Sequence, residues 1–176
     1  MNSDFNNRWA EYKNQIAARE IQQDQAAFEA KLEAENSLNS VKAYGAKVAD
    51  AAKFILAGRA IFTVVNTQTG NRFTFKISKH DKEPNFFWVG VLTGPDNVTS
   101  YTCLGRIVNS QYHHNRSSRI SEDAQSNKVF SWFWIHLHDL PKFIEVWHCG
   151  YCCCCGRLLT TPESVAAGIG PVCAGR

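Results

Sequence analysis

Six of the seven cysteines in this 176-residue chain lie in its last 29 residues, and this cluster limits the possible folds more than any other feature. Cys152 and Cys155 form a C-x-x-C pair, and Cys173 adds a third thiol after a short insert. Zn²⁺ takes four nitrogen or sulfur ligands in a tetrahedron, and a C-x-x-C turn presents two thiolates to one ion. An odd number of cysteines, four of them contiguous, favours metal binding over a disulfide framework. The tail, residues 148–176, is therefore predicted to fold around Zn²⁺.

The fourth ligand has two candidates, His148 and Cys149. His148 is preferred because it ends a predicted strand four residues before Cys152, whereas Cys149 forms an alternative C-x-x-C pair with Cys152. Two other interpretations stay open: His148 only ends the strand, or the thiolates hold an iron–sulfur cluster. A catalytic zinc needs an open position and a nearby carboxylate base, and the tail offers only Glu163. The resulting prediction is a structural zinc site in a protein that is not an enzyme.

After the C-x-x-C pair, the sequence predicts one short helix. Thr161 suits the N-cap of this helix, and Pro162 suits its first position. Gly168 and Gly170 are expected to end it. Gly156 is expected to let the backbone turn tightly around the sulfur atoms.

The motif C-x-x-C-G-R-L-L-T-x-P-E-S, followed by G-I-G-P-V-C, spans residues 152–174. It resembles an uncharacterised family of zinc-binding domains from phage and bacterial proteins, and a looser similarity extends over residues 59–148. The resemblance implies metal binding, a histidine at the position of His148, and an origin in a phage or another mobile element. It implies no known activity. This chain departs from the family at Cys153 and Cys154, where members carry polar residues.

The composition is that of a protein with a packed core, since 44% of the residues are hydrophobic and 12% are aromatic. The N-terminus is polar and lacks the apolar centre of a secretory signal. No apolar run approaches the roughly 20 residues that span a bilayer. A soluble, cytoplasmic protein without membrane contact is expected.

Residues 4–57 are predicted to be helical. Apolar residues recur at spacings of four, three and four, which is typical of the narrow seam of a coiled coil. This seam consists of Phe5, Trp9, Tyr12 and Ile16. A second seam runs to Ile55, and Gly58 suits the stop after it. The resulting helical arm, residues 1–58, either packs on the rest of the chain or serves as a homodimerisation or partner-binding element.

Residues 59–147 are predicted to form an antiparallel α+β domain, because the apolar period changes to two. Strands are expected at residues 61–65, 72–77, 86–92, 101–107 and 143–147. An irregular polar segment is expected at 109–121, and an amphipathic helix at 128–138, capped by Ser126 or Asn127. The predicted fold class is α+β, with an N-terminal helical arm, an antiparallel sheet with one packed helix, and a C-terminal zinc knuckle.

The middle of the chain is mildly basic. Residues 59–147 hold ten Lys and Arg against seven Asp and Glu, while the net charge of the whole chain is +3. Cations interleaved with aromatic side chains suit single-stranded nucleic acid. The candidate nucleic-acid-binding residues are Arg106, Tyr112, Arg116, Arg119 and Lys128. The alternative is an ordinary solvated loop.

Two functions follow as hypotheses. The first is a zinc-binding protein that contacts nucleic acid or a nucleic-acid-processing complex. The second is a phage-encoded inhibitor of a host defence system or nucleic-acid machine, which acts by protein–protein contact through the helical arm. A steep salt dependence of nucleic-acid binding favours the first, and salt-insensitive capture of a host protein favours the second.

Overall fold

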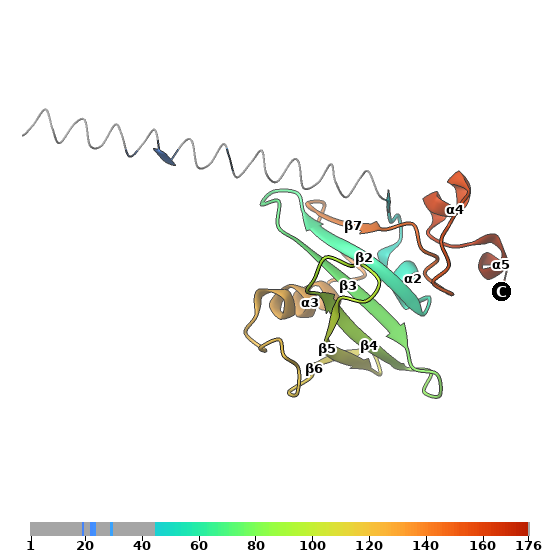
Figure 1. Ribbon diagram of the computed structural model, residues 1–176, viewed down its shortest axis with the longest axis horizontal. Coiled ribbons are helices and arrows are strands. Elements are labelled where there is room, and N and C mark those ends of the chain that lie inside the picture. Colours follow the sequence, from blue (N-terminus) through green and yellow to red (C-terminus); the bar gives the residue numbers. More distant parts are fainter. Residues whose placement is uncertain (1–18, 20–21, 24–28, 30–44, 176) are drawn as a thin grey trace, which may run out of the picture.

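The computed structural model describes Arg19, residues 22–23, Glu29 and residues 45–175. Within these residues, seven strands form one antiparallel sheet in the order β1-β7-β2-β3-β4-β5-β6 (Figure 1). The strands are β1 (Ala46–Lys47), β2 (Arg59–Asn66), β3 (Arg72–Lys79), β4 (Phe86–Leu92), β5 (Tyr101–Val108), β6 (Gln111–His114) and β7 (Ile144–His148). The helices are α2 (Ala51–Leu56), α3 (Gln125–Ile135), α4 (Pro162–Ala167) and α5 (Pro171–Ala174). This arrangement is consistent with the predicted α+β class.

The two faces of the sheet differ in burial because side chains alternate along each strand. On β4, Phe87, Val89 and Val91 are buried, while Trp88 between them is 43% exposed. The strand register carries this division to β5, where Arg106 stands opposite Trp88 and is also exposed. The face with the buried residues holds the core. The opposite face, which carries Trp88 and Arg106, is called the outer face below.

Helix α3 covers the core face through two fully buried side chains, Phe130 and Phe133. The ring centroid of Phe130 lies 5.0 Å from that of Phe75 on β3, and the centroid of Phe133 lies 5.7 Å from that of Phe62 on β2. Burial of one such side chain contributes about 1.5–3 kcal/mol. These contacts hold the helix across the middle of the sheet.

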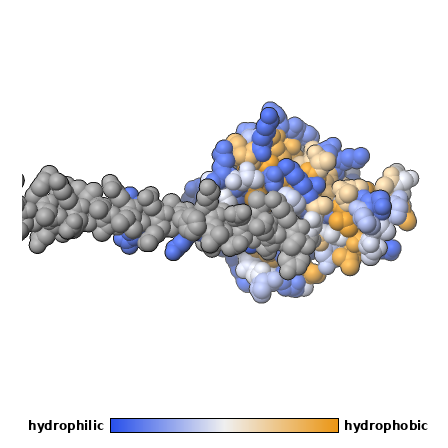
Figure 2. All heavy atoms as spheres, turned by 90° about the horizontal axis from the view of Figure 1, so that it is seen from above, coloured by the Kyte–Doolittle hydropathy of each residue, from blue (hydrophilic) through white to orange (hydrophobic). Residues whose placement is uncertain are grey.

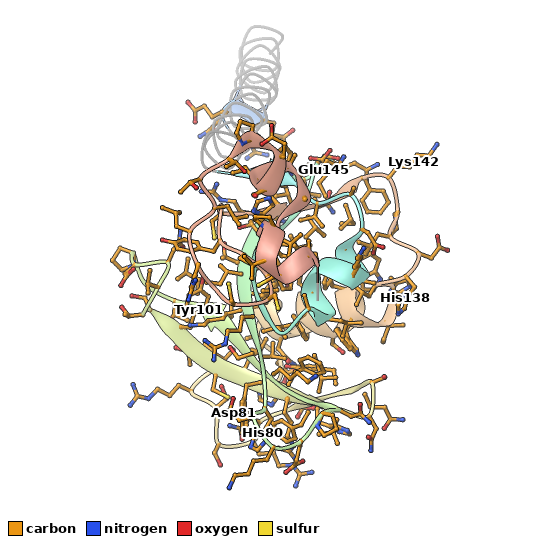
Figure 3. The ribbon with its side chains drawn as sticks, turned by 90° about the vertical axis from the view of Figure 1, so that its right-hand side faces the viewer. His80, Asp81, Tyr101, His138, Lys142 and Glu145 are labelled. Carbon is orange, nitrogen blue, oxygen red and sulfur yellow. The ribbon has the colours of Figure 1, made fainter. Side chains whose placement is uncertain are left out.

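Helix α2 closes the core at the end of the sheet that adjoins the tail. Its N-cap residue Asp50 accepts a hydrogen bond from the backbone N–H of Lys53 at 2.9 Å. Phe54 is buried, and its ring centroid lies 5.4 Å from that of His148 at the end of β7. Figure 3 shows the helices of the tail next to α2, far from the turn that carries His80. The tail is therefore packed against α2 and the β7 end of the sheet.

The continuous helix predicted up to Ala57 is wrong over residues 45–50. This segment is not helical: it contains β1, in which Ala46 pairs with His148 of β7. A Cβ atom on Gly45 would lie 1.6 Å from the carbonyl oxygen of His148, so only glycine permits this approach. Strand pairing here overrides a helical apolar spacing, which is a weak signal over so few residues.

The rest of the predicted helical arm, before Gly45, lies outside the described residues except at four positions. The division into residues 1–58, 59–147 and 148–176 stays a prediction. In the part of the chain that the structure describes, no helix has the length and apolar character needed to cross a membrane.

The segment 109–121, predicted to be irregular, contains strand β6. Asn109 and Ser110 adopt φ values of 48° and 65° and form the two-residue turn between β5 and β6. Asn enters this left-handed region more readily than most residues, which makes a tight hairpin accessible without glycine. The polar composition typical of an edge strand had concealed β6.

Helix α3 is also shifted from its predicted position at residues 128–138. It begins at Gln125, and its N-cap is Ala124, which makes no side-chain capping bond. Ser126 and Asn127, the predicted caps, are both buried inside the first turn. The Asn127 amide donates to a backbone carbonyl at 2.7 Å, so the fold uses this side chain as an internal partner and not as a cap.

Candidate functional site

The C-x-x-C segment forms a tight turn that backbone hydrogen bonds hold in place. The Gly156 N–H donates to the carbonyl of Cys152 at 2.8 Å, and the Cys152 N–H donates to the carbonyl of Arg157 at 2.8 Å. Gly156 has a φ of 73°, which confirms its predicted role in the turn. The Arg59 N–H, at the start of β2, donates to the carbonyl of Cys153 at 2.6 Å. This bond fastens the turn to the sheet.

Two short helices return Cys173 to this turn. Thr161 is the N-cap of α4 and accepts a hydrogen bond from a backbone N–H at 3.3 Å, and Pro162 is the first helical residue. Gly168 ends α4 with a φ of 67°, and Gly170 is the N-cap of α5. The predicted cap, first residue and end of α4 at Gly168 are therefore confirmed. Gly170 does not end α4 but begins α5, a second helix that was not predicted.

Cys152, Cys155 and Cys173 form what we call the thiol cluster. Their sulfur atoms all lie within 4.8 Å of one another. Cys152 is buried, the other two are partly exposed, and none of the three is in a disulfide. Three of the four predicted ligands are thus brought together.

The thiols in the cluster differ in acidity. Burial opposes ionisation of Cys152, but backbone N–H groups, among them that of Gly170 at 3.4 Å from the sulfur, more than offset it and lower its pKa to about 7. Hydrogen bonding with the Cys155 thiol, followed by burial, raises the pKa of Cys173 to about 12. Cys152 therefore ionises more readily than Cys173, whose thiol would release its proton as a cation binds.

The donor set fits a soft divalent cation. Zn–S bonds are about 2.3 Å long, so two thiolates on one tetrahedral ion lie roughly 3.8 Å apart. Sulfur atoms that are already within 4.8 Å of one another need only a small rearrangement to reach this spacing. The thiol cluster can therefore hold a metal ion.

His148 does not join the thiol cluster, because both of its ring nitrogens are hydrogen-bonded to the backbone. Nε2 donates to the carbonyl oxygen of Val165 in α4 at 2.7 Å, and Nδ1 accepts from the N–H of Gly150 at 3.1 Å. Burial lowers the pKa of His148, and the Val165 carbonyl only partly opposes this effect. The neutral ring holds β7 to α4. Alternation along β7 signals this inward position, since Val146 and His148 share the buried face.

The remaining cysteines of the tail also lie outside the cluster. Burial raises the pKa of Cys149, the alternative fourth ligand. Cys153 is 3% exposed and belongs to the hydrophobic core, and burial raises its pKa to about 11. Cys154 is partly exposed, and its thiol hydrogen-bonds with that of Cys173, which adds to the raised pKa of Cys173.

The predicted nucleic-acid-binding cations lie on β5, on α3 and in the loop between β6 and α3. Arg106 is exposed on the outer face of β5, and Arg116 and Arg119 are exposed in the loop after β6. Lys128 is exposed on α3, which covers the core face, and its ammonium lies 3.6 Å from a carboxylate oxygen of Asp123. The structure therefore places Arg106 and Lys128 on different sides of the sheet.

Tyr112 is engaged inside the fold. Its hydroxyl donates to Oδ1 of Asn127 at 2.7 Å, and its ring centroid lies 4.8 Å from that of Phe130. A Cβ atom on Gly105 would come within 2.8 Å of the tyrosine hydroxyl oxygen, so the glycine makes room for the ring. Tyr112 does not present its ring to a ligand on the outer face.

A group of aromatic side chains on the outer face was not predicted as a site. Trp88 is exposed, its ring centroid lies 4.7 Å from that of Phe86, and the centroid of Phe86 lies 5.1 Å from that of His80. Trp88 stands opposite Arg106 in the register of β4 and β5. Alternation along β4 could have revealed Trp88, because both of its neighbours in sequence point to the core. These four residues are called the outer-face patch.

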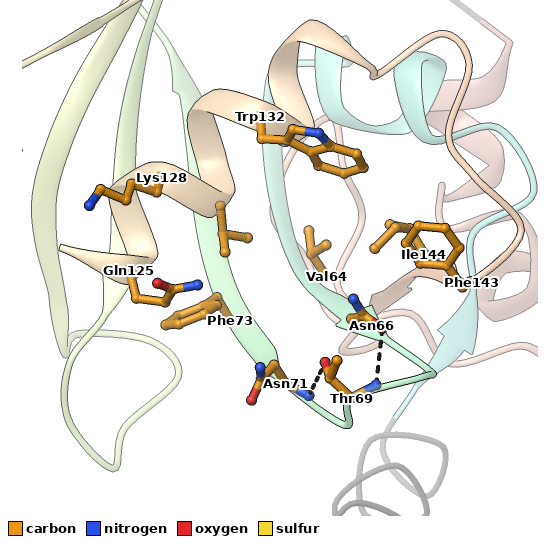
Figure 4. Close-up of a pocket in the computed structure, with 11 residues that line it drawn as sticks. Val64, Asn66, Thr69, Asn71, Phe73, Gln125, Lys128, Trp132, Phe143 and Ile144 are labelled. Carbon is orange, nitrogen blue, oxygen red and sulfur yellow. Dashed lines mark hydrogen bonds between the residues drawn. The ribbon is translucent and has the colours of Figure 1, made fainter. Parts of the chain in front are cut away.

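A cleft of about 460 Å³ opens between α3 and the β2–β3 turn (Figure 4). Its walls are largely apolar and include Val64, Phe73 and Trp132. Lys128 is the one titratable residue among the described residues that line it, and the lysine ammonium points away from the cleft. The cleft therefore offers no acid, base or metal ligand.

Comparison with known proteins connects only the tail to others. The sequence profile of a family of unknown function (DUF6011) matches residues 148–176. The matched residues include the whole thiol cluster and the segment 152–174 on which the sequence resemblance rests. No curated protein and no solved structure matches the chain.

Proposed function

We propose that this protein binds single-stranded nucleic acid through the outer-face patch, while Zn²⁺ in the thiol cluster stabilises the tail. The zinc is structural in this proposal. Thiolates select Zn²⁺ over hard cations, and no carboxylate lines the cleft beside the cluster among the described residues. The proteins of the matched family have no known function, so the nucleic-acid part rests on the outer face alone.

The observation that carries the proposal is an exposed tryptophan beside an arginine on an open face of strands β4 and β5. Trp88 is 43% exposed although it lies in the middle of a strand. Stacking of a base on an aromatic side chain contributes about 1–3 kcal/mol and tolerates any base. Arg106, in the cross-strand position, is placed to neutralise the phosphate next to a stacked base.

Further cations support the same surface. The ammonium of Lys76 lies 5.4 Å from the ring centroid of Tyr101, on neighbouring positions of the outer face. The loop with Arg116 and Arg119 continues along β5, where the Asn115 N–H donates to the carbonyl of Leu104 at 3.0 Å. A basic border around an aromatic centre is typical of single-strand binding surfaces.

The test is fluorescence anisotropy of a labelled, mixed-sequence single-stranded DNA over a range of salt concentrations. Trp88→Ala is expected to weaken binding about 5- to 150-fold, which corresponds to the loss of one stacked base at about 1–3 kcal/mol. Arg106→Ala is expected to reduce the slope of log K against log salt by roughly 0.7, the value for one phosphate contact on a single strand.

The matched control is Trp132→Ala. Trp132 is 37% exposed, but it lies on α3 across the sheet from the patch, so its loss is expected to leave the dissociation constant unchanged. Equal losses in the two tryptophan variants would contradict the proposal. Wild-type protein that binds neither DNA nor RNA at low salt would also contradict it, and would favour the protein–protein hypothesis.

A further inference from the structure

The thiol cluster supplies three donors, and no other candidate ligand in the described part of the chain completes it. Both nitrogens of His148 are occupied by backbone partners. Cys153 is enclosed in the hydrophobic core. The Cys154 thiol hydrogen-bonds with that of Cys173, but neither Cys154 nor Cys149 belongs to the group whose sulfur atoms all lie within 4.8 Å of one another. Among the described residues, no fourth side chain lies within ligand distance of all three sulfur atoms.

The three sulfur donors share a cleft. A hollow of about 320 Å³ is lined by all three cysteines and by residues of α4, α5 and the segment before them. Leu158 and Val172, on its walls, are 62% and 71% exposed. Figure 2 shows apolar surface at the end of the molecule where the tail lies. The side of the cluster that has no protein donor therefore opens onto an accessible, partly apolar space.

We propose that the fourth coordination position of the bound metal faces this cleft and accepts a small exogenous thiol. This inference rests on the proposed zinc site, and it revises the expectation that His148 completes the ligand set. A tetrahedral ion with three protein ligands keeps one position for a ligand from solution. The protein holds the three sulfur atoms on one wall of the cleft and leaves the side of the metal that faces the cleft without a protein ligand.

The chemistry of the cleft favours a thiol that carries a carboxylate. Arg157 is the one charged residue among the described residues that line the cleft, and it is exposed. A metal held by thiolates favours a further soft sulfur donor, and the guanidinium of Arg157 can pair with a carboxylate on the same molecule. When the thiol binds, its sulfur would replace the solvent ligand on the metal. The solvent ligand would leave as water, and the thiol proton would pass to the buffer.

The experiment has two measurements on the full chain. X-ray absorption of the zinc-loaded protein is expected to give three sulfur ligands and one oxygen. The Co²⁺-loaded protein is then titrated with mercaptoacetate and with 2-mercaptoethanol while its visible absorption bands are followed. Both thiols are expected to change the bands, and mercaptoacetate is expected to bind two- to fivefold more tightly, since an exposed ion pair contributes about 0–1 kcal/mol.

Substitutions separate the alternatives. Arg157→Gln is expected to remove the preference for mercaptoacetate and to leave the affinity for 2-mercaptoethanol unchanged. His148→Gln, Cys149→Ser and Cys154→Ser are each expected to keep the Co²⁺ bands of the wild type. A fourth sulfur that disappears in Cys149→Ser or Cys154→Ser, a nitrogen ligand that disappears in His148→Gln, or bands that do not respond to either thiol would overturn the inference.

The zinc site and the open coordination position are refuted by different results. If the wild-type protein binds neither Zn²⁺ nor Co²⁺, the zinc site itself is refuted and the inference falls with it. If the protein binds one ion through four of its own side chains, only the open position is refuted. Nucleic-acid binding by the outer-face patch is measured separately and is independent of both results.

Discussion

The sheet and the tail differ in how much apolar surface each of them buries. Of the 20 buried apolar residues in the described part of the chain, the tail contributes three, which are Cys152, Cys153 and Leu159. The others belong to α2, to the strands and to α3, except Leu137, which lies in the turn after α3. The tail must nevertheless hold two helices and a tight turn in one arrangement.

This difference indicates that the two regions are stabilised by different interactions. Ordering one residue costs about 1–2 kcal/mol of backbone conformational entropy, and the sheet offsets this cost by hydrophobic burial. The tail buries too little to do the same. In small zinc-binding segments the free energy of metal binding is the free energy of folding. We therefore expect metal removal to act on the tail and core substitutions to act on the sheet.

The largest expected effect is that of Cys173→Ser. Loss of one of three thiolates should unfold the tail, because binding at structural zinc sites contributes roughly 10 kcal/mol or more. Hydrogen exchange checks this prediction directly. The amides of Cys153 and Leu159, which donate to the carbonyls of Gly168 and Gly150, should lose their protection. Amides of β3 and β4 should keep theirs.

The control for Cys173→Ser is Cys103→Ser, which removes a free and exposed thiol outside the tail. It should leave the zinc content and the protection of both regions unchanged. If Cys173→Ser retains stoichiometric zinc and a protected tail, the proposed division between metal and hydrophobic burial is wrong.

The next largest effect tests the sheet. Phe130→Ala should destabilise the protein by about 3–5 kcal/mol, because the ring is fully buried among Phe75, Tyr112 and Phe133. Denaturant unfolding measures this loss. On the same helix, Trp132→Ala removes a partly exposed ring and should cost much less. Zinc affinity should stay the same in both variants, and a coupled loss of zinc would show that the two regions are not independent.

The strands of the sheet could be predicted from the sequence because their signals are local. Alternation placed the strand at residues 86–92 at the bounds of β4, and the hairpin of β2 and β3 follows from two alternating runs around turn residues. The strands at the edges of the sheet could not be found in this way. β1 has two residues and depends on Gly45 lying against the backbone of β7, a contact between residues about 100 positions apart.

The candidate site was only partly predictable for a related reason. Cysteine spacing identified Cys152, Cys155 and Cys173, since thiolates and a C-x-x-C turn determine ligand chemistry directly. Spacing gave no information on what surrounds His148, whose hydrogen bonds join β7 to α4 across the fold. Alternation places Trp88 on the face opposite Phe87 and Val89, but which of these two faces is exposed depends on where α3 packs.

A smaller effect tests the contact between the two regions. Gly168 has a φ of 67°, and a Cβ atom there would lie 2.7 Å from the ring of the buried Phe54. Gly168→Ala should therefore lower the free energy of unfolding by about 1–2 kcal/mol because of the left-handed conformation. Displacement of the Phe54 ring should add to this loss. Thermal unfolding of the zinc-loaded protein measures this loss of stability. The control, Gly175→Ala, has a negative φ and ordinary contacts, and should be close to neutral.

The smallest expected effect is a pH dependence that comes from His148. Burial lowers the pKa of this ring in the folded protein, although the Val165 carbonyl opposes the shift. The unfolded chain therefore binds the proton more tightly, with an ordinary pKa of about 6.5. The contribution of the neutral ring is fully present above this value and is lost as the pH falls through the lower, folded pKa. Within that window one group changes the free energy of unfolding by at most about 1.4 kcal/mol per pH unit.

Zinc-loaded wild type and His148→Gln, unfolded by denaturant between pH 7.5 and 5, isolate this contribution. Glutamine keeps one donor and one acceptor but has no proton to gain in this range. Protonation of the thiolates lowers stability in both proteins, so the difference between the two curves reports on His148 alone. The wild-type curve should fall more steeply below about pH 6.5. Parallel curves would mean that the ring is not held neutral between β7 and α4, and that the link between sheet and tail lies in the packing of Gly168 on Phe54.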